Sequence, residues 1–343
     1  MRELAEALAR FEAAGPVARA VVLATWGSAP RPPGASLLLA ADGRVEGSVS
    51  GGCVENAVIA ELEAARAAGR PKRLRYEVSD ETAWSVGLAC GGTIEVLAEP
   101  SVPDLVRSAI SDARGSVVVS ALDGSVRWRV LEGGMIACAG MPDDVREAAI
   151  SALAGERSAL IDPPPTHDAR RTTHLFLEVF ARAPELCIIG AGHVAQELVP
   201  LARRLGFTTK VFDPRATFLT RERFPDADQL IQGWPAEELP KHLGPGSFVC
   251  VLSHDPKFDE PCVRLALRSP ARYVGVIGSK KNQEKRRTAL AAEGFTPEEI
   301  ARLHGPIGLA LGGKQPNEIA LAIVAEMVKV RYGTLLPSRP GVQ

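Results

Sequence analysis

Residues 185–213 read ELCIIGAGHVAQELVPLARRLGFTTKVFD. The apolar run Leu186–Ile189 predicts a short buried strand, Gln196–Leu205 has helical spacing, and Thr208–Phe212 predicts a second strand. The intervening turn, from Gly190 to Ala195, has the pattern GxGxxA. Its first glycine makes the tight turn, its second admits a pyrophosphate to the backbone, and alanine can replace the third. The order strand, turn, helix, strand therefore predicts a dinucleotide-binding βαβ unit.

An acidic residue follows the second strand of this unit. Asp213 lies 23 residues beyond Gly190, where a carboxylate that binds ribose hydroxyls is expected, and it favours an unphosphorylated ribose. Strands are also predicted over residues 247–252 and 273–277, and polar residues follow each. Ligands of open parallel sheets collect beyond the carboxyl ends of the strands. We therefore expect Gly192, Asp213, His254 and Ser279 to meet in one crevice.

Several residues near this crevice have two interpretations. Arg215 either binds a nucleotide phosphate or pairs with Glu222 or Asp226, and His254 either contacts the ligand or bonds its own backbone in a turn. Further candidates are His193, within the glycine turn, and Lys280, which with Lys281 otherwise forms a solvated helix start. Beyond them, Thr296 opens a capping box, His304 is expected to cap the C-terminus of that helix, and Pro316 opens a long helix.

The N-terminal part carries a cysteine in a glycine-rich segment, TWGSAPRPPGASLLLAADGRVEGSVSGGC, residues 25–53. A helical pattern follows, so Cys53 lies in or just before the first helical turn, a position that favours the thiolate. Gly51 and Gly52 let backbone N–H groups approach an anion. The alternative is an inert, buried thiol. Cys90-Gly91-Gly92 mirrors this arrangement before a predicted strand.

The other four cysteines are expected in the core: Cys138, Cys187, Cys250 and Cys262. The sequence has no CxxC motif and no Cys/His spacing typical of a zinc site. Six cysteines without framework spacing also argue against a secreted disulfide scaffold.

Composition indicates an ordinary globular protein. The chain has 343 residues, a hydrophobic fraction of 46% and a net charge of −1, which gives no electrostatic reason to bind nucleic acid or an anionic membrane. No signal peptide or membrane span is expected, so the cytoplasm is the default location. A proline-rich connector at residues 162–166 and Arg182-Ala183-Pro184 predict two domains, 1–180 and 185–335.

The first domain is expected to contain a degenerate repeat with an offset of about 96 residues. Each copy begins with a strand, near Val21 or Val117, and continues through a strand, a turn, a short strand and an amphipathic helix. The second copy lacks both RPPG and SGGC. This difference supports functional roles for Arg31, Gly34 and Cys53.

Seven motifs together resemble the XdhC/CoxI family of molybdenum hydroxylase accessory proteins: TWGSAPRPPGA, GSVSGGCVE, LACGGTIEV, GAGHVA, Asp213 to Arg215, YVGVIGSKK and HGPIGLALGGKQPNEIALAIVAE. The resemblance spans the chain in order and implies an α/β fold, with a thiol-bearing N-terminal α/β domain and a Rossmann-like, doubly wound parallel sheet. It implies that the protein binds molybdenum cofactor, as molybdopterin or its dinucleotide form.

The resemblance also implies that the protein works with a cysteine desulfurase to place sulfur on the molybdenum and delivers the product to an apo molybdenum hydroxylase of the xanthine dehydrogenase type. Cys53 and Cys90 are then candidate thiols for the molybdenum, in a non-catalytic chaperone, and a homodimer is left open. Two alternatives remain. One is an NAD(P)-dependent oxidoreductase with His254 as acid/base, and the other is a redox sensor in which Cys53 and Cys90 form a disulfide.

Overall fold

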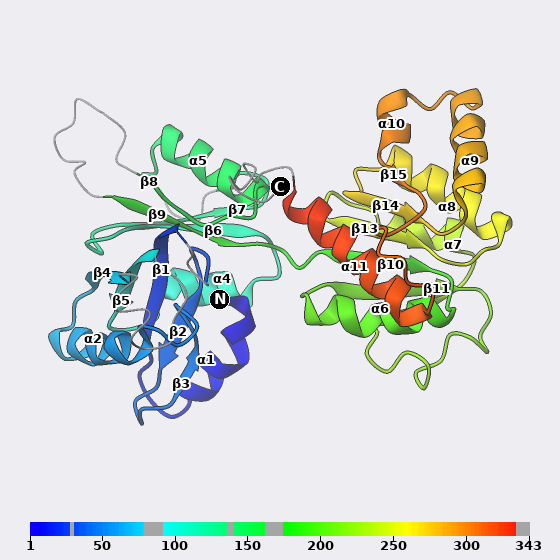
Figure 1. Ribbon diagram of the computed structural model, residues 1–343. Helices are drawn as coiled ribbons and strands as arrows, with labels where there is room; N and C mark the ends of the chain where they lie inside the picture. Colours follow the sequence, from blue (N-terminus) through cyan, green and yellow to red (C-terminus); the bar gives the residue numbers. More distant parts are fainter. Residues whose placement is uncertain (28–30, 79–91, 136–139, 162–173, 334–343) are drawn as a thin grey trace. The chain divides into compact units, whose positions relative to one another are not determined.

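The computed structural model describes residues 1–27, 31–78, 92–135, 140–161 and 174–333 (Figure 1). The chain divides into two compact units, Met1–Arg182 and Ala183–Gln343. The boundary falls within the segment Arg182-Ala183-Pro184. In the described part of the chain, no helix is long and apolar enough to cross a membrane.

The N-terminal unit is built from two antiparallel sheets. The first has the order β3-β2-β1-β5-β4, and the second has the order β7-β6-β9-β8. The strands are β1 (Ala18–Gly27), β2 (Ser36–Leu39), β3 (Val45–Gly47), β4 (Lys72–Val78), β5 (Gly92–Glu99), β6 (Ser116–Ala121), β7 (Arg127–Leu131), β8 (Ala159–Ile161) and β9 (Leu175–Phe180). The helices are η1 (Arg2–Leu4), α1 (Ala5–Glu12), α2 (Glu55–Ala68), α4 (Asp104–Ser111) and α5 (Asp143–Ala154).

The two sheets share one topology. Strands β2-β1-β5-β4 correspond in order to β7-β6-β9-β8. Helix α2 follows β3, and helix α5 follows β7. The short strand that the sequence repeat predicts before α5 falls on residues 136–139, outside the described residues. Each strand packs against a different layer on each of its two faces, because successive side chains of a strand point to opposite faces of the sheet. On β1, Ala20 and Val22 pack with Leu62 of α2, whereas Val21 packs with Phe176 of β9.

A buried charged cluster joins the two sheets. The guanidinium of Arg19 on β1 contacts Glu99 of β5 at 3.3 Å and also Glu178 of β9, and all three side chains are almost fully buried. Arg127 pairs with the same Glu99 at 2.8 Å. Each buried charge thus has a partner of opposite sign, as a low-dielectric interior requires.

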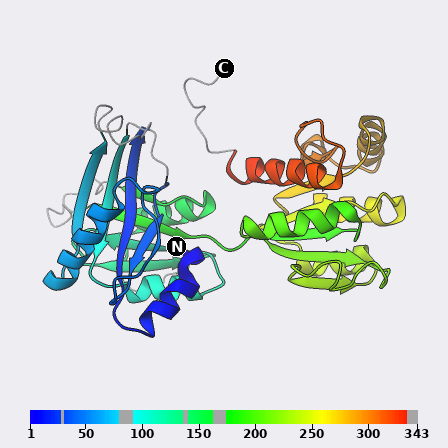
Figure 2. The same cartoon turned by 60° about the horizontal axis from the view of Figure 1, so that its bottom comes forward.

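The C-terminal unit has a six-stranded parallel sheet of order β12-β11-β10-β13-β14-β15 between two layers of helices (Figure 2). The strands are β10 (Glu185–Ile189), β11 (Thr208–Asp213), β12 (Gln229–Gln232), β13 (Ser247–Val251), β14 (Tyr273–Val276) and β15 (Leu303–His304). The helices are α6 (His193–Arg204), α7 (Pro235–Glu238), η2 (Leu239–His242), α8 (Pro256–Arg268), α9 (Lys280–Ala292), α10 (Pro297–Ala301) and α11 (Pro316–Tyr332). The predicted Rossmann-like sheet is confirmed.

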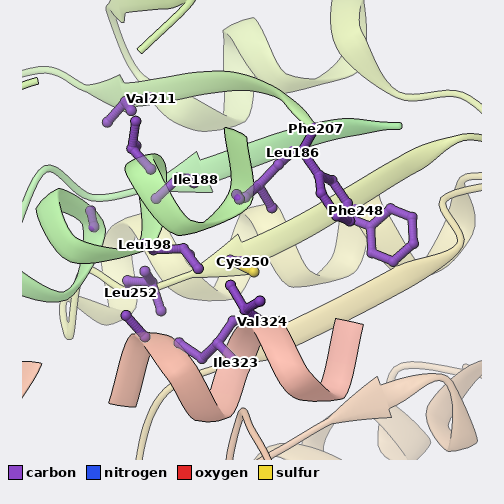
Figure 3. Close-up of a cluster of buried hydrophobic side chains, with 14 of the residues drawn as sticks. Leu186, Ile188, Leu198, Phe207, Val211, Phe248, Cys250, Leu252, Ile323 and Val324 are labelled. Carbon is purple, nitrogen blue, oxygen red and sulfur yellow. The ribbon is translucent and has the colours of Figure 1, made fainter. Parts of the chain in front are cut away.

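Alternation along β10 again assigns each face. Leu186 and Ile188 pack toward α6 and α11, where Leu198 and Ile323 complete the cluster of Figure 3. Cys187 and Ile189 pack on the opposite face of the sheet, against α8. Burying both faces explains why the strand reads as a continuous apolar run.

Near the C-terminus, two predictions hold and one is wrong. The capping box of Thr296 is present at the start of α10, and Pro316 opens α11. His304 is not a helix cap, because α10 ends at Ala301 and His304 lies on β15. Its Nδ1 atom is 3.3 Å from Oε1 of Glu326 on α11.

Candidate functional sites

The N-terminal motifs lie at one end of the first sheet. Gly27, the last residue of β1, pairs with Gly92, the first residue of β5, which also pairs with Val78, the last residue of β4. Strand β3 runs toward the same end, because Gly47 pairs with Leu37 near the start of β2. The segment that carries Cys53 therefore leaves β3 in the direction of the ends of β1 and β4. Cys90 and Gly91 lie outside the described residues.

The loop before α2 is folded around Glu55. The Glu55 carboxylate accepts hydrogen bonds from the Ser48 hydroxyl at 2.6 Å, from the backbone N–H groups of Ser50 and Gly52 at 2.9 Å each, and from the Ser50 hydroxyl. Partial burial alone would raise its pKa, but the hydrogen bonds from Ser48, Ser50 and the backbone hold that pKa at about 2. The Glu55 carboxylate thus accepts the hydrogen bond of the Gly52 N–H, which the sequence analysis assigned to an external anion.

The remaining amides of this loop are also bonded internally. The N–H of Gly51 donates to the Ser48 hydroxyl at 2.8 Å, and the N–H of Cys53 donates to the Ser50 hydroxyl at 3.0 Å. The prediction that Gly51 and Gly52 cradle a phosphate through their amides is therefore corrected. A carboxylate three residues after Gly52, as in a capping box, is the sequence signal that was missed.

Cys53 differs from the other described cysteines. Its side chain is exposed immediately before α2, whereas Cys187, Cys250 and Cys262 are fully buried. Burial raises the pKa of the Cys187 and Cys262 thiols to about 12 and that of Cys250 well above its ordinary value. Three of the four predicted core cysteines are confirmed, and Cys138 lies outside the described residues. The exposed thiol is chemically available.

Arg31 lies in the connection between β1 and β2, three residues before Gly34. The N–H of Gly34 donates to the carbonyl of Val22 on β1 at 2.8 Å, which anchors the loop to the sheet. The guanidinium of Arg31 is 3.9 Å from Glu3, and its Nε atom is buried without a hydrogen-bond partner among the described residues. Among the described residues, the ion pair of Arg31 is with Glu3 and not with the loop that carries Cys53.

In the C-terminal unit, the strand order reverses between β10 and β13. Open parallel sheets bind their ligands at such a point, beyond the carboxyl ends of the strands, so the predicted crevice belongs here. Gly190 has φ +100°, and a Cβ atom there would lie 2.7 Å from Cα of Ser253 at the end of β13. Only glycine fits this close approach. At Gly192 a Cβ atom would meet nothing within 4 Å, so the second glycine leaves open space before α6.

Asp213 is placed differently from a free ribose ligand. It is fully buried, and its Oδ2 atom accepts the N–H of Ala191 at 2.9 Å. Arg215 donates to it from the backbone N–H at 2.9 Å, from Nε at 2.9 Å and from Nη2 at 2.8 Å. Burial would raise the pKa of Asp213, but these hydrogen bonds lower it below its ordinary value. Arg215 therefore pairs with Asp213, and not with Glu222 or Asp226.

Two residues that the sequence did not indicate complete this end of the crevice. The Phe218 ring centroid lies 4.4 Å from the Arg215 guanidinium carbon and 5.3 Å from that of Arg223. Arg223 also donates to the carbonyl of Ala191 at 3.1 Å. No local sequence pattern predicts these contacts, because they depend on how the segment after β11 folds back toward Ala191.

The loop after β13 presents His254 in a constrained backbone conformation. His254 is exposed and has φ +62°, which is uncommon for a residue other than glycine. Ser253 donates to the buried Asp259 at 2.5 Å and accepts the N–H of Asp255 at 3.2 Å. Asp255 caps α8 by accepting the N–H of Lys257. These bonds hold the turn around His254.

The last three predicted residues lie at helix starts. Ser279 caps α9 and accepts the N–H of Asn282 at 3.3 Å, and Lys280 is exposed in the first turn of that helix. His193 is the exposed first residue of α6. Among the described residues, no group of three or more His, Cys, Asp or Glu side chains could hold a metal ion by itself.

Comparison with known proteins places the chain in a family. The model of the XdhC Rossmann domain matches residues 186–327, and the model of the XdhC and CoxI family matches residues 11–77, which contain Arg31 and Cys53. The chain belongs to the XdhC and CoxI family. The resemblance found from the sequence is therefore confirmed.

Individual relatives agree with this family. The chain is 29% identical to a protein of Bacillus subtilis that is named as a probable subunit of xanthine dehydrogenase, over 91% of this chain and 92% of the relative. It is 24% identical to "Molybdenum cofactor insertion chaperone PaoD" of Escherichia coli, over 89% of this chain and 80% of the relative. A crystal structure described as a xanthine dehydrogenase from Bacillus halodurans is 27% identical and superposes with a TM-score of 0.75, over 99% of this chain and 98% of that one.

Proposed function

We propose that this XdhC and CoxI family member is an accessory protein that binds molybdenum cofactor as cargo. It supports the sulfuration of that cofactor and its insertion into a molybdenum hydroxylase of the xanthine dehydrogenase type. Relatives named as a probable subunit of xanthine dehydrogenase and as a molybdenum cofactor insertion chaperone support this role. The single observation that carries it is the exposed thiol of Cys53 on a loop fixed by Glu55.

The chemistry of Cys53 suits a transferable cargo. A thiolate is a soft ligand that molybdenum accepts, and an exposed position allows a partner protein to take the cargo away. Cys90 is proposed as the second thiol on the sequence pattern alone. A cysteine desulfurase is proposed as the source of the sulfur on the family resemblance alone.

The rival function, an NAD(P)-dependent oxidoreductase, rests on the glycine turn and on His254. His254 is exposed in a turn that is held at the strand reversal, so it could exchange a proton with a bound substrate. The buried Asp213 argues against ordinary NAD binding, because its oxygens are already bonded. Hydride transfer from NADH by the purified protein would favour this rival.

The test compares a molybdenum hydroxylase made in cells with and without this protein. We expect client from the deletion cells to be abundant and folded, but with little activity and little cyanide-releasable sulfur or molybdenum. Complementation with wild type should restore all three values, whereas Cys53→Ser should not. The buried Cys262→Ala variant serves as the control and should complement. Equal activity, sulfur and molybdenum in both backgrounds would refute the accessory role.

A further inference from the structure

The carboxylate of Asp213 has no acceptor capacity left for a ligand. It accepts four N–H groups, one from Ala191 and three from Arg215. An ionised carboxylate offers about four acceptor positions, so all of them are occupied. The residue is fully buried, and giving up the Ala191 bond would leave a buried amide unpaired. A ribose diol would have to displace these bonds to reach Asp213.

Arg215 has the opposite property. A guanidinium carries five N–H donors, and Asp213 accepts from two of them. Within the described ranges, no residue accepts from the other three, and the side chain is 48% exposed. Asp213 fixes one edge of the guanidinium and Phe218 packs at 4.4 Å from its carbon. The outward donors are thus held in a defined orientation.

We propose that the end of β11 binds a phosphate monoester through Arg215, in place of a ribose diol through Asp213. An arginine fork matches phosphate oxygens in geometry and charge, whereas a hydroxyl offers only a neutral acceptor. Nearby charges nearly balance, since Arg223 packs on the same ring and the carboxylate of Asp255 is close enough to act electrostatically on Arg215. The specificity therefore comes from the free donors of Arg215 and not from a general positive field.

Two ligands could supply this phosphate. One is the 2′-phosphate of an NADP-type dinucleotide, and the other is the terminal phosphate of molybdopterin. The second source rests on the proposed function, and the first does not. Both require a phosphate ester that reaches the free edge of Arg215, so both make the same demand on this residue.

The experiment uses calorimetry on the full chain with two ligand pairs. The first pair is NADP⁺ and NAD⁺, and the second is oxidised molybdopterin before and after phosphatase treatment. We expect the phosphorylated member of at least one pair to bind about tenfold tighter or more. A preference in the first pair identifies the dinucleotide as the source, and a preference in the second identifies the pterin.

Variants assign the preference to this residue. Arg215→Gln should abolish it, and Arg215→Lys, which keeps the charge but loses the fork, should retain part of it. The matched control is Arg203→Gln, since Arg203 is 45% exposed and pairs with Asp228 at the other end of α6. Absence of a preference in both pairs, or its persistence in both Arg215 variants, would overturn the proposal. Because no client enzyme is involved, this outcome is independent of the test of accessory function.

Discussion

The backbone N–H of Gly52 donates a 2.9 Å hydrogen bond to the carboxylate of Glu55. This bond turns the Gly52 amide inward, while the neighbouring thiol of Cys53 stays exposed to solvent. The loop is therefore shaped by an anion that the chain itself supplies. Glu55 acts as a positioning residue for Cys53, and its removal should disturb the loop before any other part of the sheet.

We expect Glu55→Gln to destabilise the protein by about 1–2 kcal/mol, because the hydrogen bonds to a charged acceptor are replaced by bonds to a neutral amide. It should also weaken binding of molybdenum cofactor. Urea unfolding and cofactor retention measure the two effects. Glu61→Gln, on the same helix, removes only a surface ion pair with Lys72 and should cost about 0.5 kcal/mol or less. Equal losses in the two variants would contradict the special role of Glu55.

The same carboxylate should make stability depend on pH. The pKa of Glu55 is about 2 in the folded protein, below its ordinary value of 4.5. Its ionised form therefore contributes stability above about pH 4.5, and this contribution is lost as the pH falls toward 2. We expect the difference in unfolding free energy between wild type and Glu55→Gln to shrink between pH 5 and pH 3. A difference that stays constant or grows over this range would exclude the assigned pKa shift.

The sequence mostly predicted features that depend on residues close together in the chain. The turn from Gly190 to Ala195 and the capping box of Thr296 depend on residues a few positions apart, and both form as expected. The fully apolar strand at Leu186 likewise indicated a sheet buried on both faces. By contrast, the cluster around Arg19 joins residues 80 and 159 positions apart, and no local pattern announces it.

The sequence predicted the positions of the candidate site residues more accurately than their hydrogen-bond partners. Asp213 lies at the expected strand end. The sequence could not show, however, that the Arg215 side chain would turn back and donate hydrogen bonds to both oxygens of the Asp213 carboxylate. Cys53 lies just before a helix as expected, yet the loop amides bond to Glu55. In both cases a nearby side chain of the chain itself takes the bonds that had been assigned to a ligand.

Thiol reactivity should separate Cys53 from the buried cysteines. We expect iodoacetamide to modify Cys53 in the folded protein, while Cys187, Cys250 and Cys262 react only after unfolding, because burial raises their pKa and excludes the reagent. Peptide mass spectrometry with and without urea gives each rate separately. Modification of Cys262 as fast as Cys53 under native conditions would contradict the burial described here.

The same substitution should destabilise the protein at Gly190 but not at Gly192. A methyl group at Gly190 would lie 2.7 Å from the backbone of Ser253, at φ +100°, so Gly190→Ala should destabilise the protein by about 2 kcal/mol or more. At Gly192 the methyl group meets nothing within 4 Å and φ is −81°, so Gly192→Ala should leave stability within about 0.5 kcal/mol.

Substitution of Gly192 should instead affect ligand binding. If a phosphate-bearing ligand approaches the backbone at Gly192, the added methyl group occupies the space that the ligand needs, and affinity should fall although the fold is intact. Gly192→Val should weaken binding further. Thermal unfolding and calorimetry on the same preparations distinguish the two roles. Stability lost at Gly192, or ligand affinity unchanged by both Gly192 substitutions, would show that the open space beside the turn is not used for binding.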